Sequence, residues 1–389
     1  MQKKIIALAI AGLASTAAFA QSNVTIYGSV DAGYTYRFDN ENRVNGNAGN
    51  STTRSSIDTG NSAGNRLGFK GVEDLGNGLK AVFLLEQGFN FDNGTQGQGG
   101  RMFGRQAYVG LTGGFGTAIA GRLYTPFFSL WSSVDPFGAG TVGQARNIWS
   151  SGADVSGLLD PVRVDNAVAY VSPNFGGFDV TLAYSNASAV SDSATVTTAG
   201  SNNAENLNNN ARNNTVYALL AKYSAGPVMV GFNAHRIAPG AGVTIATAAK
   251  SIDNYTLAGT FDAKVVKVHD LATYNMVDTN AARSDFTGSN YMLGLTVPVG
   301  KVNLKTSVGF SDFNGENFSG LRGQATQYVL GADYALSKRT NLYSAYSLID
   351  GQSARAGTIM GTGDASNSGM AATGNPFQQG FTMGVRHQF

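Results

Sequence analysis

The chain has 389 residues with 27 basic and 25 acidic side chains, so its formal net charge is only +2. A charge this close to balance gives no support to a nucleic-acid partner. The sequence contains no cysteine, which excludes a fold held by disulfides. Its 51 glycines, 22 phenylalanines and 16 tyrosines favour turns and strands over helices.

The N-terminus has the layout of a secretory signal peptide. The basic pair Lys3-Lys4 precedes an apolar run over residues 5–13, and the small residues that follow end in Ala18-Phe19-Ala20. We expect cleavage at that point, which leaves residues 21–389 as a single domain with equal numbers of acids and bases. The leader (1–20) therefore predicts export from the cytoplasm.

The exported part has no apolar run that approaches the ~18 residues a membrane-spanning helix needs. Instead, segments with alternating apolar and polar residues are joined by short turns and long polar loops in strict alternation. Side chains alternate between the two faces of a strand, so each segment has one apolar and one polar face. The pattern predicts sixteen strands, seven short turns and eight longer loops, which is typical of an outer-membrane barrel. A soluble periplasmic β protein is the alternative class.

The predicted strands follow one another along the whole exported chain. They lie at about 23–37, 63–73, 79–91, 101–112, up to 122, 163–172, 178–184, 212–224, 227–237, 251–261, 264–275, on both sides of Gly300, at 328–336, after Lys338-Arg339, and at 380–389. The stretch between the first two strands, up to about residue 60, is expected to be loop. The segment 264–275 alternates poorly.

The charged residues decide which face of the strands meets water. Arg66, Lys70, Arg105 and Arg163 lie within or beside apolar alternations. Because a Lys or Arg on the lipid side costs roughly 2–4 kcal/mol at the bilayer midplane, these four side chains are expected to face the lumen. Arg37, Arg122 and Glu86 are further expected lumen residues. Side chains cannot fill a barrel of sixteen strands, so a water-filled channel is expected.

Several sequence runs resemble the trimeric general-diffusion porins of Gram-negative bacteria, in particular the β-proteobacterial branch. The resemblance rests on the order and spacing of short runs across the whole exported chain rather than on one motif. The runs are Val24–Asp31, Asn65–Gly71, Gly104–Leu111, Ala120–Arg122, Asn166–Tyr170, Ser172–Gly177 and the terminal Phe389.

The resemblance implies an all-β fold, a 16-stranded antiparallel transmembrane β-barrel with an inward-folded third loop, here at about 123–162. Three such barrels would form a homotrimer in the outer membrane. The family's acidic constriction residues carry over to Asp135, with Asp154 and Asp160 as further candidates. The opposing basic wall carries over to Arg66, Arg105 and Arg163, with Lys70 beside Arg66.

An opposed pair of charged walls creates a transverse field across a narrow aqueous gap, which favours polar solutes. The alternative for each basic residue is a simple pairing with a lumen carboxylate such as Asp31, Glu86 or Asp165. Lumen acids and bases are nearly balanced, so the sequence leaves the sign of ion selectivity open, with a slight lean to anions.

We therefore expect a non-enzymatic pore for small hydrophilic solutes and ions; a substrate-selective channel is the alternative. Expected partners are other copies of the chain, outer-membrane lipid and lipopolysaccharide, and the insertion machinery that reads the C-terminal strand with Phe389. No cofactor or metal is expected: the three histidines are scattered, and the run Gly138–Gly143 matches a dinucleotide fingerprint only formally, without a βαβ unit around it.

Overall fold

The computed structural model describes residues 23–39, 53–149, 162–188, 214–238, 249–279, 286–315, 323–351 and 377–389. The expected leader (1–20) and two of the acidic candidates, Asp154 and Asp160, lie outside the described residues. Within the described ranges, no helix is both long enough and apolar enough to cross a bilayer.

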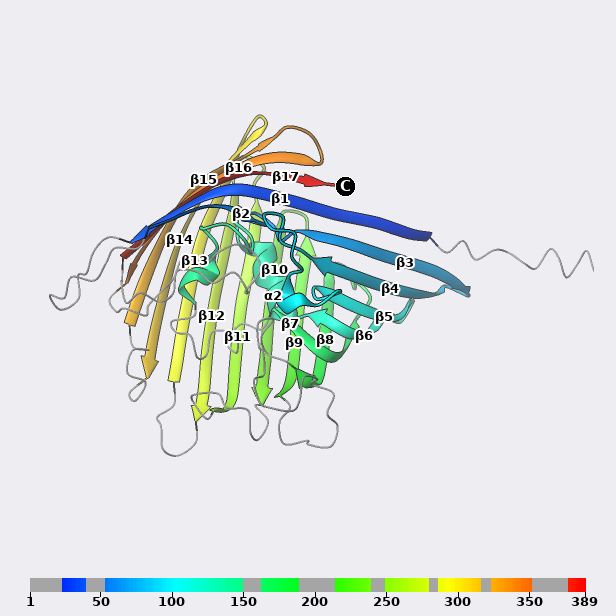
Figure 1. Ribbon diagram of the computed structural model, residues 1–389. Helices are drawn as coiled ribbons and strands as arrows, with labels where there is room; N and C mark the ends of the chain where they lie inside the picture. Colours follow the sequence, from blue (N-terminus) through cyan, green and yellow to red (C-terminus); the bar gives the residue numbers. More distant parts are fainter. Residues whose placement is uncertain are drawn as a thin grey trace, which may run out of the picture.

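Seventeen strands and three short helical segments make up the described chain (Figure 1). The strands are β1 (Asn23–Asp39), β2 (Thr53–Thr59), β3 (Arg66–Gly76), β4 (Leu79–Gly88), β5 (Gln106–Gly113), β6 (Gly116–Tyr124), β7 (Arg163–Val171), β8 (Phe178–Ser188), β9 (Asn214–Ala225), β10 (Val228–Ala238), β11 (Ala249–Asp262), β12 (Lys267–Thr279), β13 (Phe286–Val299), β14 (Val302–Gly315), β15 (Gly323–Ala335), β16 (Thr340–Gly351) and β17 (Phe377–Gln388). The helical segments are η1 (Gln98–Gly100), α2 (Pro126–Val134) and η2 (Ala145–Ile148).

The sheet closes on itself. From β3 to β17 each strand pairs antiparallel with the next, and β1 pairs antiparallel with β17 from Ser29–Gln388 to Asp39–Gln378. A closed barrel has no unpaired edge. The predicted sixteen-stranded barrel is confirmed, because β2 and β3 are two halves of one barrel strand that both pair with β1.

The division between β2 and β3 corrects the predicted loop before residue 60. β2 was missed because its only large apolar side chain is Ile57, so no apolar alternation marks it. The interruption, residues 60–65, is held by Asp31 of β1, whose Oδ2 accepts from the backbone N–H groups of Ser62 (2.7 Å) and Ala63 (2.8 Å). Oδ1 of the same carboxylate accepts from the hydroxyl of Tyr343 in β16 (2.5 Å).

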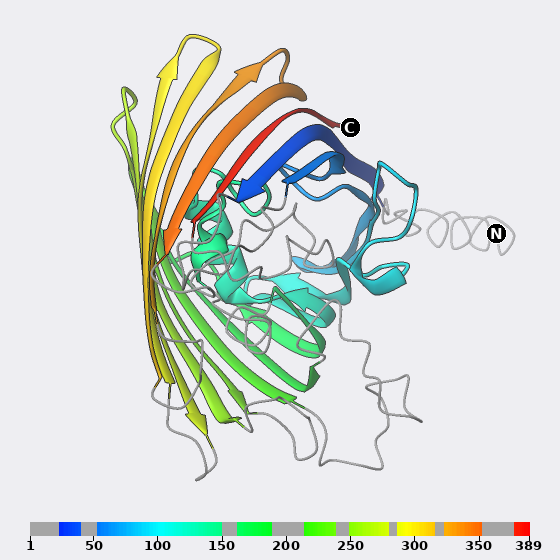
Figure 2. The ribbon, with the colours of Figure 1, turned by 60° about the vertical axis from the view of Figure 1, so that its left-hand side comes forward.

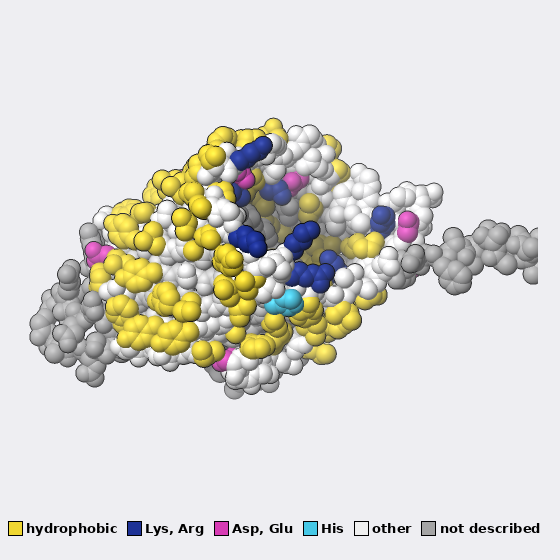
Figure 3. Space-filling model, turned by 90° about the horizontal axis from the view of Figure 1, so that it is seen from above, with side chains coloured by type: hydrophobic (Ala, Val, Ile, Leu, Met, Phe, Trp, Pro, Cys, Tyr) yellow, Lys and Arg dark blue, Asp and Glu magenta, His cyan; other side chains and the backbone are white. Residues whose placement is uncertain are grey.

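The two faces of the wall differ as the alternation predicts. Outward-pointing apolar residues such as Ile26, Leu182 and Tyr291 are about half exposed, whereas many polar residues of the strands are buried on the inner face, among them Asn233, Thr256 and Asn290. Seen along the barrel, hydrophobic side chains cover the outer wall, and Lys and Arg side chains gather around a central hollow (Figure 3). Apolar groups without a protein cover on the outside fit contact with hydrocarbon.

The segment between β6 and β7 lies on the lumen side of the wall, as far as the structure describes it (Figure 2). α2 begins after Thr125, whose Oγ1 accepts from the N–H of Phe128 (3.1 Å), with a proline at the first helical position. Its buried face packs against inward-pointing apolar residues of the far wall. These residues include Leu220, Ala258, Leu271 and Met292.

Candidate functional site

A buried arginine and glutamate pair forms the base of the candidate site. Arg105, immediately before β5, and Glu86 of β4 are 4% and 2% exposed. Arg105 Nε donates to Glu86 Oε1 at 2.9 Å, and its backbone N–H donates to the Glu86 carbonyl at 3.1 Å. The other carboxylate oxygen, Oε2, accepts from the Tyr27 hydroxyl at 2.8 Å. Both oxygens of Glu86 are therefore occupied, and the pair is fixed in the wall.

Tyr124, the last residue of β6, connects this pair to a second arginine. Its hydroxyl accepts from Nη2 of Arg105 at 2.7 Å and from Nη2 of Arg163 at 3.4 Å. The guanidinium of Arg163 also lies 5.0 Å from the centre of the Tyr124 ring, within the range of a cation–π contact. The same ring packs against Phe128 of α2, with 4.8 Å between ring centres. We call residues 125–149 the inner segment. The two arginines and the inner segment thus contact the same aromatic residue, Tyr124.

Arg66 completes the group from the start of β3. Its Nε donates to the Gly64 carbonyl at 3.1 Å, and its charge acts on Glu86 and Arg105. A Cβ at Gly64 would lie 2.5 Å from Arg105 Nη1, so the glycine permits the close approach. We call Arg66, Arg105 and Arg163 the arginine cluster. Lys70 lies apart from it: its side chain is exposed, with Nζ 5.3 Å from the centre of the Tyr27 ring.

Arg122, predicted as a lumen residue, belongs to a separate ion-paired group. Its Nη1 donates to Asp165 Oδ1 at 2.5 Å, and Arg101 Nη1 donates to Asp165 Oδ2 at 2.8 Å. The Nε of Arg122 donates to the Gly104 carbonyl at 2.6 Å. The alternative stated above, in which a basic residue pairs with a lumen carboxylate, therefore holds for Arg122, which pairs with Asp165, and for Arg105, which pairs with Glu86.

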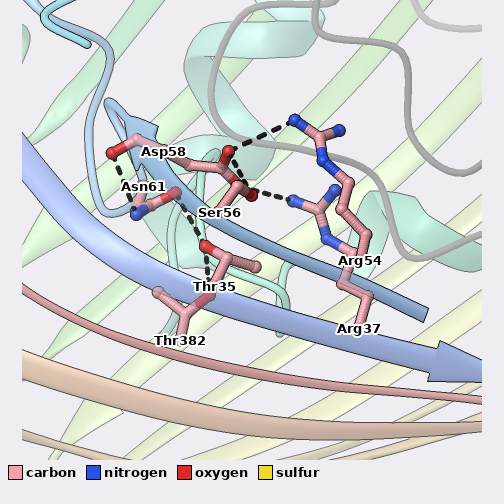
Figure 4. A network of polar contacts seen from close by, with 7 residues as sticks. All are labelled: Thr35, Arg37, Arg54, Ser56, Asp58, Asn61 and Thr382. Atoms are coloured by element: carbon pink, nitrogen blue, oxygen red, sulfur yellow. Dashed lines mark hydrogen bonds and ion pairs between the residues drawn. The ribbon is translucent and has the colours of Figure 1, made fainter.

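Arg37 lies on the same inner face of the barrel, nearer the end of β1. Its Nη2 donates to Asp58 Oδ2 at 3.3 Å, and Arg54 Nη2 donates to Asp58 Oδ1, also at 3.3 Å (Figure 4). Ser56 donates to Asp58 Oδ1 at 2.8 Å. The side chains of Arg37 and Asp58 are 1% and 4% exposed, while that of Arg54 is 38% exposed.

Asp135 follows α2 and organises the inner segment from within. Oδ1 accepts from the backbone N–H of Phe137 (2.8 Å) and Oδ2 from that of Ala145 (2.7 Å). Burial raises the pKa of Asp135 to about 7, although the two backbone donors act in the opposite direction. The carboxylate is therefore committed to the segment's own backbone, and its role as an acidic wall of a pore stays a prediction.

The glycines that formally match a dinucleotide fingerprint serve close packing instead. A Cβ at Gly140 would lie 2.7 Å from the Asn61 carbonyl oxygen and 2.9 Å from the Ser62 carbonyl carbon. A Cβ at Gly143 would lie 2.4 Å from the Val329 side chain of β15. The inner segment is thus held by the aromatic face of α2 and, at Gly140, by the interruption 60–65.

The C-terminus is tied to the first strand. Phe389 N–H donates to the Gly28 carbonyl at 3.1 Å, and Gly28 N–H donates back to the Phe389 carbonyl at 3.0 Å. The phenyl ring is 47% exposed and covers the Gly28 backbone. Recognition of this residue by insertion machinery stays a prediction.

Sequence reasoning missed the two tyrosines of the site. Tyr27 and Tyr124 bind arginine or glutamate side chains on the inner face, and the alternation of β1 already placed Tyr27 on the same side as Ser29 and Asp31. The alternation of β1 could therefore have predicted that Tyr27 points inward. No group of three or more His, Asp or Glu side chains that could hold a metal occurs among the described residues.

Comparison with known proteins agrees with this geometry. Residues 7–354 match the family described as Gram-negative porin. The chain is 32% identical to an outer membrane porin protein of Bordetella pertussis over 88% of this chain and 93% of that protein. It is 31% identical to outer membrane porin protein 32 of Delftia acidovorans over the full length of both. Among solved structures, an anion-selective porin from Comamonas acidovorans superimposes with a TM-score of 0.72 at 28% identity, covering 95% of this chain and 100% of that one. The chain belongs to the Gram-negative porin family.

Proposed function

We propose that this chain is a general-diffusion pore with a preference for anions, and that its narrowest part lies between the arginine cluster and the inner segment 125–149. Membership of the family makes the chain a channel of the outer membrane for passive diffusion, not an enzyme. The proposal adds where solutes meet the strongest field and which sign of charge they prefer.

The observation that carries the proposal is the gathering of three arginine side chains at one level of the wall. Three guanidiniums, those of Arg66, Arg105 and Arg163, gather around Tyr124 and Glu86. Among the described residues, the carboxylate that contacts this group is that of Glu86. Low-dielectric walls focus the field of such charges across a narrow aqueous gap. The similar structure from Comamonas acidovorans is described as anion-selective, which supports the same sign here.

The inner segment supplies the opposing side of the gap. Tyr124 ends β6 beside the arginine cluster, and the chain continues directly into α2, which crosses to the wall of β9–β12. The buried aromatic residues Phe127, Trp131 and Trp149 hold the segment there. Asp135, Asp154 and Asp160 remain the candidate acids of this side.

We also infer a homotrimer in a membrane that contains lipopolysaccharide, with assembly signalled by the C-terminal strand and Phe389. The resemblance to trimeric porins supports this, and so does the wide exposed apolar outer wall. Cross-linking of the folded protein in outer-membrane vesicles tests it: a ladder that stops at three copies is expected, and a ladder that stops at one would contradict it.

The decisive experiment is the zero-current potential of the purified protein in a planar bilayer under a salt gradient. The wild type should give the sign of an anion-preferring pore. Arg105→Ala and Arg163→Ala should each move the potential towards cation preference, because each removes one positive charge from the cluster. Arg339→Ala, in the turn before β16, is the matched control and should leave the potential unchanged.

Unchanged potentials in both variants would remove the arginine cluster from the constriction. Heat-dependent migration of the folded barrel on a gel shows that each variant is folded. Block of the current by one solute but not by others of similar size would favour the substrate-selective channel instead.

A further inference from the structure

We propose that three glycines on the inner face of the barrel wall, Gly231 of β10, Gly294 of β13 and Gly309 of β14, are positioning residues that set the width of the pore. Each leaves room for one residue of the inner segment, and together they determine how close this segment comes to the arginine cluster. The inference rests on the proposed function, since it takes the narrowest part of the pore to lie between these two elements.

Two of the glycines each receive a buried aliphatic side chain. A Cβ at Gly231 would lie 2.5 Å from Cδ1 of Leu130, which belongs to α2. A Cβ at Gly309 would lie 2.9 Å from Cδ1 of Ile148, which belongs to η2. Carbon atoms in contact normally keep about 3.5–4.0 Å between them. Leu130 and Ile148 are 1% and 0% exposed within one apolar cluster, so neither side chain has free space into which it can turn.

The third glycine receives a rigid ring. A Cβ at Gly294 would lie 2.8 Å from Cγ and 3.1 Å from Cδ of Pro136, which is buried just after α2. The proline ring is closed onto its own backbone nitrogen, so it cannot turn away from a new methyl group without moving the backbone. The three contacts therefore engage the helix, the chain that follows it and η2, and they hold the inner segment at three places along its length.

A polar contact beside Gly294 fixes the position of the segment along the wall. His269 of β12 pairs with Gly294 in the register of the sheet, and its Nδ1 donates to the carbonyl of Val134 at 2.6 Å. Its Nε2 accepts from the Thr296 hydroxyl at 3.0 Å, so both ring nitrogens are used. Because this bond resists sliding along the wall, a methyl group at Gly294 would be accommodated by movement of the segment away from the wall.

Movement away from this wall carries the inner segment into the lumen. α2 contacts the wall from β8 to β12, whereas the residue before the segment, Tyr124, accepts from Arg105 and Arg163 of the arginine cluster. A close-packed interior transmits strain because it has few voids. Restoring an ordinary carbon contact requires a shift of about 1 Å, which would narrow the gap by a similar distance. Glycine at the three wall positions thus keeps the gap wide.

The test compares the single-channel conductance of alanine variants in planar bilayers. Gly231→Ala, Gly294→Ala and Gly309→Ala should each lower the conductance by about a fifth or more, because the packed wall passes the strain to the inner segment. Gly288→Ala is the matched control, since a Cβ there would lie 2.5 Å from Phe313, a residue of the wall itself. It should lower the unfolding temperature of the barrel but leave the conductance unchanged.

Conductance at or above the wild-type value in the three folded variants would overturn the proposal, and so would an equal loss in Gly288→Ala. Such a result in a pore that still prefers anions removes only this inference, whereas a cation-preferring wild type removes the proposed function.

A double variant separates displacement of the segment from a general loss of stability. Leu130→Val keeps an apolar side chain but lacks Cδ1, the atom that a Cβ at Gly231 would meet. Residues in direct contact show non-additive effects, so Gly231→Ala should no longer lower the conductance when it is combined with Leu130→Val. An equal loss of conductance with leucine and with valine at position 130 would overturn the role of this contact in setting the width of the pore.

Discussion

Glu86→Gln tests whether the arginine cluster sets ion selectivity, because it changes one charge and almost no volume. Glu86 is 2% exposed, and its two oxygens accept from Arg105 Nε at 2.9 Å and from the Tyr27 hydroxyl at 2.8 Å. Glutamine has one acceptor oxygen, so only one of these two donors keeps its partner. The variant removes the negative charge that acts on Arg105 and Arg66.

The size of the effect follows from Coulomb's law. A unit charge about 8 Å from a permeating ion in water changes the energy of that ion by about 0.5 kcal/mol. The change favours anions and disfavours cations, so the permeability ratio shifts by about 1 kcal/mol, or roughly fivefold towards anions. Breaking a buried ion pair also costs about 3–5 kcal/mol of stability. The variant should therefore be more anion-selective and less stable.

The assay is the zero-current potential at low salt, where screening is weak, together with the temperature at which the folded barrel unfolds. Asp74→Asn is the matched control. Asp74 pairs with Lys80 in the register of β3 and β4. Lys80 is six residues before Glu86, which is about 20 Å along the strand. The Asp74→Asn substitution therefore removes the same charge at the short-turn end of the barrel and should leave both readouts unchanged. A shift of Glu86→Gln towards cations, or no shift in a folded pore, would refute the account of the cluster as the selectivity element.

Two further predictions concern the inner segment. Gly140→Val places side-chain atoms against the backbone of Asn61 and Ser62, because a Cβ at this position would lie only 2.7 Å from the Asn61 carbonyl oxygen. Overpacking of this kind typically costs about 1–3 kcal/mol of stability. The variant should therefore lower the unfolding temperature of the barrel and change the single-channel conductance. Gly114→Ala, which meets nothing within 4 Å, is its control, and equal effects of the two would contradict the packing argument. The pKa of Asp135 is raised to about 7 from an ordinary value of about 3.9, so the folded chain binds this proton more tightly than the unfolded chain. The resulting stability is present below about pH 4 and lost as the pH rises to about 7, and Asp135→Asn should abolish this dependence in the unfolding temperature; identical pH profiles would show that Asp135 does not titrate in this range.

Much of the barrel could be predicted from the sequence because each strand carries its own period-two signal. The signal is clear in β17, where Phe381, Met383 and Val385 lie on the outer face and the inner face between them is polar, with Thr382 and Arg386. β12 shows where the signal fails. Leu271 and Val277 point inward in this strand, because Leu271 packs against the inner segment and Val277 belongs to a second buried apolar cluster. Apolar residues on the inner face make both faces of the strand apolar in places, so the alternation is weak. The weak pattern of β12 therefore results from packing against apolar groups inside the barrel.

The arginine cluster shows what alternation alone does not contain. Placing Arg66, Arg105 and Arg163 inside the barrel follows from the cost of a charge in lipid, but their meeting at one level depends on two irregular features. The interruption 60–65 turns Arg66 and the Gly64 backbone towards Arg105, and Tyr124 offers one hydroxyl to two guanidiniums. Neither feature repeats with a period of two residues.

These irregular features also explain how three like charges stay together at one level of the wall. Like charges in one cluster repel one another, so something must hold Arg105 and Arg163 in place. The hydroxyl of Tyr124 accepts from both, and its ring joins them to Phe128 at the start of α2. The residue that orders the arginine cluster therefore also directly precedes the inner segment, which we propose to face it. Because the two sides of the gap are fixed through one side chain, a change in either should be felt by the other, and selectivity and conductance should change together in variants of Tyr124.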